Sequence, residues 1–101
     1  MRYLGVMRGS GSMSCGGEPM GRADYDIDGF LTQPGEIVGS GEICMAPDDL
    51  GRAFGRTNLR LTTDEGRVLE VRFSGKRLDS TSTAAHADIT GDLPPVSQWR
   101  R

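Results

Sequence analysis

The chain has 101 residues, which suffice for one domain, and its formal net charge of −2 is too small to expand it by self-repulsion. Fifteen glycines argue against a helical bundle, because glycine is costly inside helices and useful in turns and bulges. Two cysteines are too few for a disulfide framework and no run approaches the roughly 20 apolar residues of a membrane span, so we expect a cytoplasmic protein with free thiols.

The N-terminal segment, residues 1–22, is rich in glycine and serine and has few side chains that could anchor it to a core. This composition is typical of a flexible segment, so we expect a tail here. Met1, Met7 and Met13 are each a candidate translation start, and a later start would make part of the tail an artefact of the assigned start.

Two strands are predicted next. The first covers residues 24–31, where apolar side chains alternate with three aspartates. A Gln-Pro-Gly turn signal separates it from the second, which covers residues 36–45. Gly39 and Gly41 lie on the apolar face of this second strand and indicate a bulge or a sharp bend at the corner of a barrel.

A short helix is predicted over residues 47–54. Pro47 suits its first position, and the two aspartates that follow lie where the helix dipole favours negative charge. Leu50, Ala53 and Phe54 have the spacing of one apolar face, which would pack on the sheet.

The strongest local pattern is a β-hairpin over residues 58–73. The run Asp-Glu-Gly at 64–66 fits a three-residue loop with its glycine in the left-handed conformation, and this loop sets the register of the two strands. The register pairs Leu61 with Leu69, Leu59 with Val71, and Arg60 with Glu70. Two apolar pairs and one pair of opposite charges therefore follow from one loop.

A last strand is predicted over residues 84–90, giving five strands and one short helix. This order predicts a mainly β fold, either a small five-stranded antiparallel barrel or a bent sheet. We expect a single β domain over residues 23–95 and a frayed C-terminus over residues 96–101, from which Trp99 could dock back.

The sequence Asp24-Tyr-Asp26-Ile-Asp28-Gly resembles the opening of an EF-hand calcium loop, with carboxylates at alternate positions and glycine at the sixth. The resemblance covers six residues only. Gly35 stands where the loop needs a bidentate glutamate, and the flanking helices are missing. A calcium site of another kind at the three aspartates stays an alternative to an outward-facing acidic strand.

No complete catalytic pattern is present. His86 and Asp88 would share one face of a strand, but no nucleophile setting accompanies them. Cys15 and Cys44 lack the short spacings of zinc ligands. We therefore expect a protein without enzymatic activity and without a cofactor.

Charge is segregated along the chain. Residues 17–50 carry eight acidic side chains and one arginine, whereas residues 51–78 carry seven basic and three acidic ones. The two segments either neutralise each other within the fold or present a basic face to an acidic partner. The candidate residues of that face are Arg56, Arg60, Arg72, Lys76 and Arg77. Nucleic acid is a weaker candidate partner, because the pattern lacks the interleaved aromatic residues that stack single-stranded bases.

Together these features favour a non-enzymatic small β domain that acts through protein–protein contact, as a homo-oligomer or an accessory module. The alternatives are ligand or calcium binding through Asp24, Asp26 and Asp28, and weak nucleic-acid binding through the basic face over residues 56–77.

Overall fold

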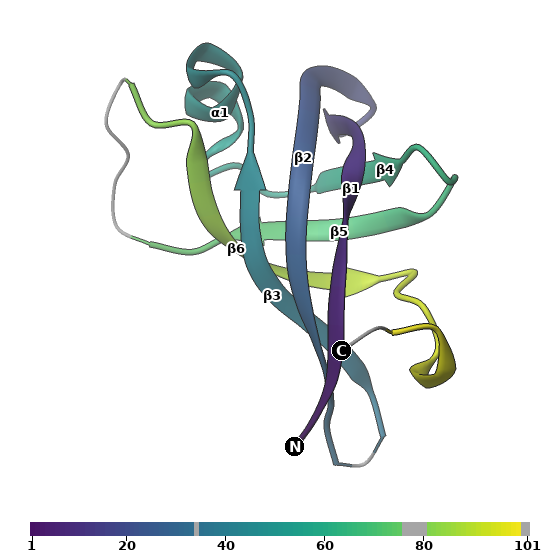
Figure 1. Cartoon of the computed structure of the whole chain (residues 1–101). Helices are drawn as coiled ribbons and strands as arrows, with labels where there is room; N and C mark the ends of the chain where they lie inside the picture. Colours follow the sequence, from purple (N-terminus) through teal and green to yellow (C-terminus); the bar gives the residue numbers. More distant parts are fainter. Residues whose placement is uncertain (34, 76–80, 100–101) are drawn as a thin grey trace.

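The computed structural model describes residues 1–33, 35–75 and 81–99, which form mainly antiparallel strands (Figure 1). The strands of this part of the chain are β1 Arg2–Cys15, β2 Glu18–Leu31, β3 Ile37–Cys44, β4 Leu59–Thr63, β5 Val68–Phe73 and β6 Ala84–Gly91. The α-helix α1, Pro47–Ala53, connects β3 to β4, and the 3-10 helix η1, Val96–Gln98, follows β6. The prediction of a mainly β fold with one short helix is confirmed.

The strands close into one antiparallel barrel in the order β1-β2-β3-β6-β5-β4. When paired residues are followed from strand to strand round the barrel, the path starts at Gly5 of β1 and ends at Cys15 of β1. One circuit therefore shifts the position along β1 by ten residues. This stagger tilts the strands against the barrel axis and leaves a narrow interior that side chains can fill. The barrel has one strand more than predicted, namely β1.

The N-terminal segment corrects the expectation of a flexible tail over residues 1–22. Residues 2–15 form β1, which pairs with β2 along its length and with β4 over its last five residues. Gly11 and Met13 are buried while Ser12 between them is exposed, so the strand alternates like any other. Pairing with these strands, which are distant in the sequence, keeps β1 extended. The glycine- and serine-rich composition of the segment gives no sign of that pairing.

The hairpin of β4 and β5 has the predicted register. Leu61 pairs with Leu69, Leu59 with Val71 and Arg60 with Glu70. The backbone N–H of Thr63 donates to the carbonyl of Arg67 at 2.8 Å and closes the loop, in which Gly66 has φ +96°. Both the loop and the pairing that it sets are therefore as predicted.

Strand β3 bends strongly across the barrel (Figure 1). The pairing of β2 with β3 is continuous along β3, so no bulge interrupts it at Gly39 or Gly41. A Cβ at Gly39 would lie 2.7 Å from a methyl group of Ile27, and one at Gly41 would meet the backbone at Asp26. The two glycines thus allow β2 to approach β3 closely where β3 bends. Of the two features that the sequence indicated here, the structure has the bend and not the bulge.

Two segments close the ends of the barrel. The helix α1 covers one end and buries Leu50 and Ala53 completely (Figure 1). The C-terminal segment, residues 92–99, covers the other end, and Trp99 is only 8% exposed. The expectation of a frayed end over residues 96–101 is therefore wrong as far as Trp99, because residues 96–98 form η1 and the Trp99 indole docks on the barrel. Residues 100–101 lie outside the described chain.

The core lies inside the barrel and beneath these two covers. Its largest fully buried side chains are Met13, Ile27, Ile43, Leu50, Leu59, Leu61, Leu69 and Ile89. Among the residues that the structure describes, no helix is both long enough and apolar enough to cross a lipid bilayer.

Candidate functional site

The three aspartates of the predicted calcium site lie on the outer face of β2. Each carboxylate accepts a hydrogen bond from a different side chain of β1. These bonds run from Ser10 to Asp24, from Arg8 to Asp26 and from Tyr3 to Asp28, at 2.5, 3.0 and 2.9 Å. The described residues contain no group of three or more His, Cys, Asp or Glu side chains placed to hold a metal ion. The carboxylates are thus directed to separate partners rather than to a common point.

The predicted basic face is distributed over β4, β5 and the turn after α1. Arg60 lies opposite Glu70 in the β4–β5 pair, and Arg72 lies opposite Asp88 in the β5–β6 pair. Arg56 donates to the backbone carbonyl of Arg52 at 3.1 Å. Lys76 and Arg77 lie outside the described residues. Acidic neighbours on adjacent strands therefore face both strand arginines.

The acidic and basic strands lie on opposite sides of the barrel. In the closed order of six strands, β5 is diametrically opposite β2. The acidic side extends onto β3, where Glu42 lies directly across from Asp26. Arg8 of β1 pairs with Asp26, so the negative charge of this side is balanced in part by β1 and not by the basic strands β4 and β5.

The histidine considered for catalysis is exposed on the outer face of β6. His86 lies opposite Glu42 of β3, and Asp88 lies opposite Arg72 of β5. Cys44 is also on the outer face, where burial and then the nearby carboxylates raise the pKa of its thiol. These groups surround no cavity together, and each has the environment of an ordinary outer strand position.

A gap in the barrel wall lies beside the N-terminal half of β1. The pairing of β1 with β4 begins at Gly11, and one further backbone bond, from the N–H of Asp64 to the carbonyl of Ser10 at 2.9 Å, ends the contact. Alternate residues of a strand direct their N–H and C=O groups to the same side. Arg8 and Val6 therefore direct theirs as Ser10 does, into the gap, where no described residue pairs with them.

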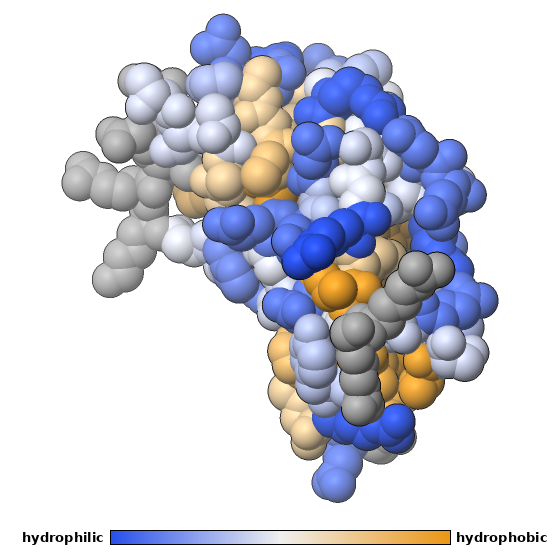
Figure 2. Space-filling view, viewed as in Figure 1, coloured by the Kyte–Doolittle hydropathy of each residue, from blue (hydrophilic) through white to orange (hydrophobic). Residues whose placement is uncertain are grey.

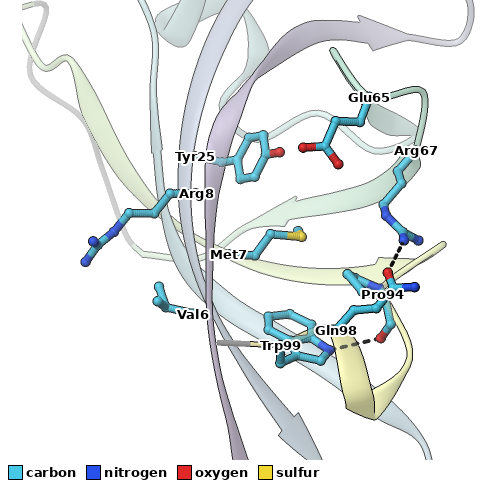
Figure 3. A pocket seen from close by; sticks show the side chains of 9 residues that line it. All are labelled: Val6, Met7, Arg8, Tyr25, Glu65, Arg67, Pro94, Gln98 and Trp99. Carbon is cyan, nitrogen blue, oxygen red and sulfur yellow. Dashed lines mark hydrogen bonds between the residues drawn. The ribbon is translucent and has the colours of Figure 1, made fainter. Parts of the chain in front are cut away.

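A cavity of about 470 Å³ occupies this gap. Figure 3 shows its walls, which come from β1 on one side, from the β4–β5 turn at one end and from the C-terminal segment on the other side. The residues that line it are Val6, Met7, Arg8, Tyr25, Glu65, Arg67, Pro94, Gln98 and Trp99. We call this cavity and the open edge of β1 the β1 groove.

The far wall of the β1 groove is held in place by two hydrogen bonds (Figure 3). The indole N–H of Trp99 donates to the carbonyl of Pro94 at 2.9 Å, and Nη2 of Arg67 donates to Oε1 of Gln98 at 2.7 Å. Nη1 of Arg67 also lies 3.9 Å from a carboxylate oxygen of Asp92. The C-terminal segment is thereby fastened to the start of β5.

Besides the open backbone of Val6 and Arg8, two side-chain groups of the β1 groove have no hydrogen-bond partner among the described residues: the hydroxyl of Tyr25 and the carboxylate of Glu65. The ring of Tyr25 is buried, and burial, followed by the negative charges of Glu65 and Asp64, raises the pKa of its hydroxyl. The phenol therefore stays protonated at neutral pH, when it can both donate and accept a hydrogen bond.

The sequence did not indicate this groove. Tyr25 and Arg67 read as ordinary strand residues, Glu65 as part of a turn and Trp99 as part of a frayed end. The one available signal was Trp99, because a large aromatic residue beyond the last strand usually finds a buried place. The groove is assembled from four separate parts of the chain, and only the closed barrel brings them together.

The face seen in Figure 2 is mostly hydrophilic. Apolar patches are exposed in both its upper and its lower half, and β1 and the C-terminal segment pass through the lower one.

Comparison with known proteins identifies no relative: no family model matches the chain, and no curated protein or solved structure is significantly similar to it. The functional conclusion therefore depends on the geometry of the β1 groove.

Proposed function

We propose that the protein is a non-enzymatic binding domain that docks an extended polypeptide segment of a partner protein along the open edge of β1. The observation that supports this most directly is the early end of the β1–β4 pairing, which leaves the backbone of Val6 and Arg8 facing the cavity. An exposed edge of this kind accepts an added strand through main-chain hydrogen bonds.

The cavity suits such a segment in size and lining. Its volume of about 470 Å³ falls within the range of roughly 300–1,000 Å³ for ligand sites. Met7, Pro94 and Trp99 provide apolar contacts, while Glu65, Arg67 and Gln98 provide polar ones at the rim. Backbone pairing would supply affinity, and these side chains would select among segments.

The described lining lacks the side chains that most often act as nucleophile or near-neutral base, which favours a binding role over an enzymatic one. The nine lining residues include no serine, cysteine, threonine or histidine that could act as a nucleophile or as a base of near-neutral pKa. Tyr25 and Glu65 are the remaining candidates, and the raised pKa of Tyr25 disfavours proton removal at neutral pH.

A peptide titration tests the proposal. The probe is the capped pentapeptide acetyl-Thr-Val-Lys-Val-Thr-amide, whose valines and threonines favour an extended backbone. Binding is followed by the fluorescence of Trp99, the chain's one tryptophan, and by backbone amide shifts in β1. We expect both signals to change and to saturate, with the largest amide shifts at Val6 and Arg8.

Two substitutions at Arg8 separate the backbone from the side chain. Arg8→Pro removes the open N–H, whereas Arg8→Ala keeps it, and both lose the ion pair with Asp26. Binding should disappear in the first and persist in the second, with circular dichroism showing that both are folded. Equal binding by the two variants would overturn the proposal. Self-association of the wild type that Arg8→Pro abolishes would instead identify a second copy of the chain as the occupant of the edge.

A further inference from the structure

The β1 groove contains one acidic side chain, Glu65, and two basic ones, Arg8 and Arg67. The basic side chains around it already have partners: Arg8 pairs with Asp26 on the outer face, and Arg67 lies beside Asp92. Among the ion pairs of the described residues, none includes Glu65. Glu65 therefore offers a carboxylate without an ion-pair partner among the described residues at the β4–β5 turn, where a cationic group of a ligand could pair with it.

The free hydroxyl of Tyr25 faces the same space. Figure 3 shows the carboxylate of Glu65 and the hydroxyl of Tyr25 directed toward each other across the cavity. A carboxylate is an acceptor only, and a protonated phenol can also accept through its oxygen. An ammonium or guanidinium group has several donors, so one such group could serve both oxygens at once.

The apolar side chains nearby suit the rest of a basic residue. Met7 lies between Tyr25 and Trp99 along the cavity (Figure 3). Lysine and arginine place their methylene stems along apolar surface and keep the charged head at a polar site. The arrangement of an apolar wall followed by an acidic end matches this division.

We infer that the polypeptide segment docked on β1 presents a lysine or arginine side chain, whose cationic head binds between Glu65 and Tyr25 and whose stem packs on Met7 and Trp99. This inference rests on the proposed function and adds the chemical class of the residue that the groove selects. The charge complementarity of Glu65 is what distinguishes a basic residue from other occupants of the cavity.

The test compares three pentapeptides that differ at their central position: lysine, norleucine and glutamate in acetyl-Thr-Val-X-Val-Thr-amide. On the wild-type chain the lysine peptide should bind about two- to fivefold more tightly than the norleucine peptide, the range expected of a partly solvated charge pair. Higher salt should reduce this preference, because screening weakens the charge interaction.

Variants of the chain assign the preference to the proposed residues. Glu65→Gln should bring the two affinities close to equality, and Tyr25→Phe should reduce the preference partly. The matched control is Glu18→Gln, which removes an exposed carboxylate outside the groove and should leave the preference unchanged. A lysine preference that survives in Glu65→Gln overturns the inference.

The outcomes separate the inference from the function on which it rests. If all three peptides shift the amides of Val6 and Arg8 with the same affinity, the groove binds extended segments but does not select a basic residue. If no peptide shifts them, the proposed function itself fails. A glutamate peptide that binds most tightly would show that Arg67, not Glu65, sets the preference.

Discussion

Replacement of Gly29 with alanine tests whether Trp99 closes the barrel as tightly as the structure shows. An ideal Cβ at Gly29 would lie 2.6 Å from Cη2 of the Trp99 ring, well inside carbon–carbon contact distance. The indole is rigid and its N–H is held by the carbonyl of Pro94, so the ring cannot yield as a flexible side chain would. The whole C-terminal segment must shift instead.

The expected loss follows from two opposing terms. Overfilling a packed site costs about 1–3 kcal/mol, while alanine in place of glycine restricts the unfolded chain and recovers about 0.4–1 kcal/mol. We therefore expect Gly29→Ala to lower the free energy of unfolding by about 1–2 kcal/mol. For a chain of this size each kcal/mol corresponds to a fall in Tm of about 4–8 °C.

Urea unfolding, followed by far-UV circular dichroism and by Trp99 fluorescence, measures the loss. The matched control is Gly51→Ala in α1, where an added Cβ meets no atom within 4 Å and the helix should gain up to about 1 kcal/mol. Adding Gly29→Ala to a Trp99→Ala background should cost little, because the clashing ring is absent. An equal loss with and without the indole would refute the contact as its cause.

Three further substitutions test other parts of the fold. Gly66→Ala should lower the free energy of unfolding by about 1 kcal/mol in the same urea assay, because residues with a Cβ rarely adopt its φ of +96°. Arg67→Ala removes the 2.7 Å bond to Gln98, so Trp99 should become more exposed and its emission should shift to the red; an unchanged spectrum contradicts this role. Arg22→Gln should lower stability at pH 7 but not in strong acid. The hydrogen bond from Arg22 holds the pKa of Asp64 below its ordinary 3.8, so its stabilisation is present above that pH and is lost as the pH falls through the folded pKa. Thermal melts of both chains across this range should converge at low pH.

The β4–β5 hairpin could be predicted in detail because its information is local. A three-residue loop with glycine in the left-handed position fixes which residues face each other, and the apolar alternation of both strands agrees with that register. Leu61 and Leu69 pair as expected, and so do Arg60 and Glu70. Loop geometry and side-chain pattern gave two independent indications of the same structure.

Strand β1 was missed because its alternation does not depend on large apolar side chains. Gly9, Gly11 and Met13 occupy the inward positions, and serines occupy the outward ones. Glycine carries no hydropathy signal, so the period of two is almost invisible in the sequence. The small inward residues make sense once the barrel is closed, since Tyr25 lies over Gly9 and the backbone of β4 lies against Gly11.

The β1 groove could not be predicted because no part of it is local. Its lining joins residues from β1, β2, the β4–β5 turn and the C-terminal segment, and the strand order that unites them is not readable from neighbouring residues. The charge pattern was more informative: β2 with its three aspartates lies opposite β5 in the barrel, although the acidic and basic segments meet in the ion pairs Asp49–Arg52 and Arg22–Asp64. That separation gives the domain a polarity but does not by itself place a binding site.

The unequal lengths of the strands explain why the barrel has an open edge at all. Strand β1 has 14 residues, whereas β4 has five and turns back at the level of Ser10. The C-terminal segment covers the barrel end below that turn and lines the gap with side chains, above all Trp99, but within the described chain it adds no strand to β1. A barrel can therefore be complete as a packed core and still leave part of one strand unpaired. Lengthening β4 and β5 by two residues each would extend the pairing toward Arg8, so this change should seal the groove while preserving the core.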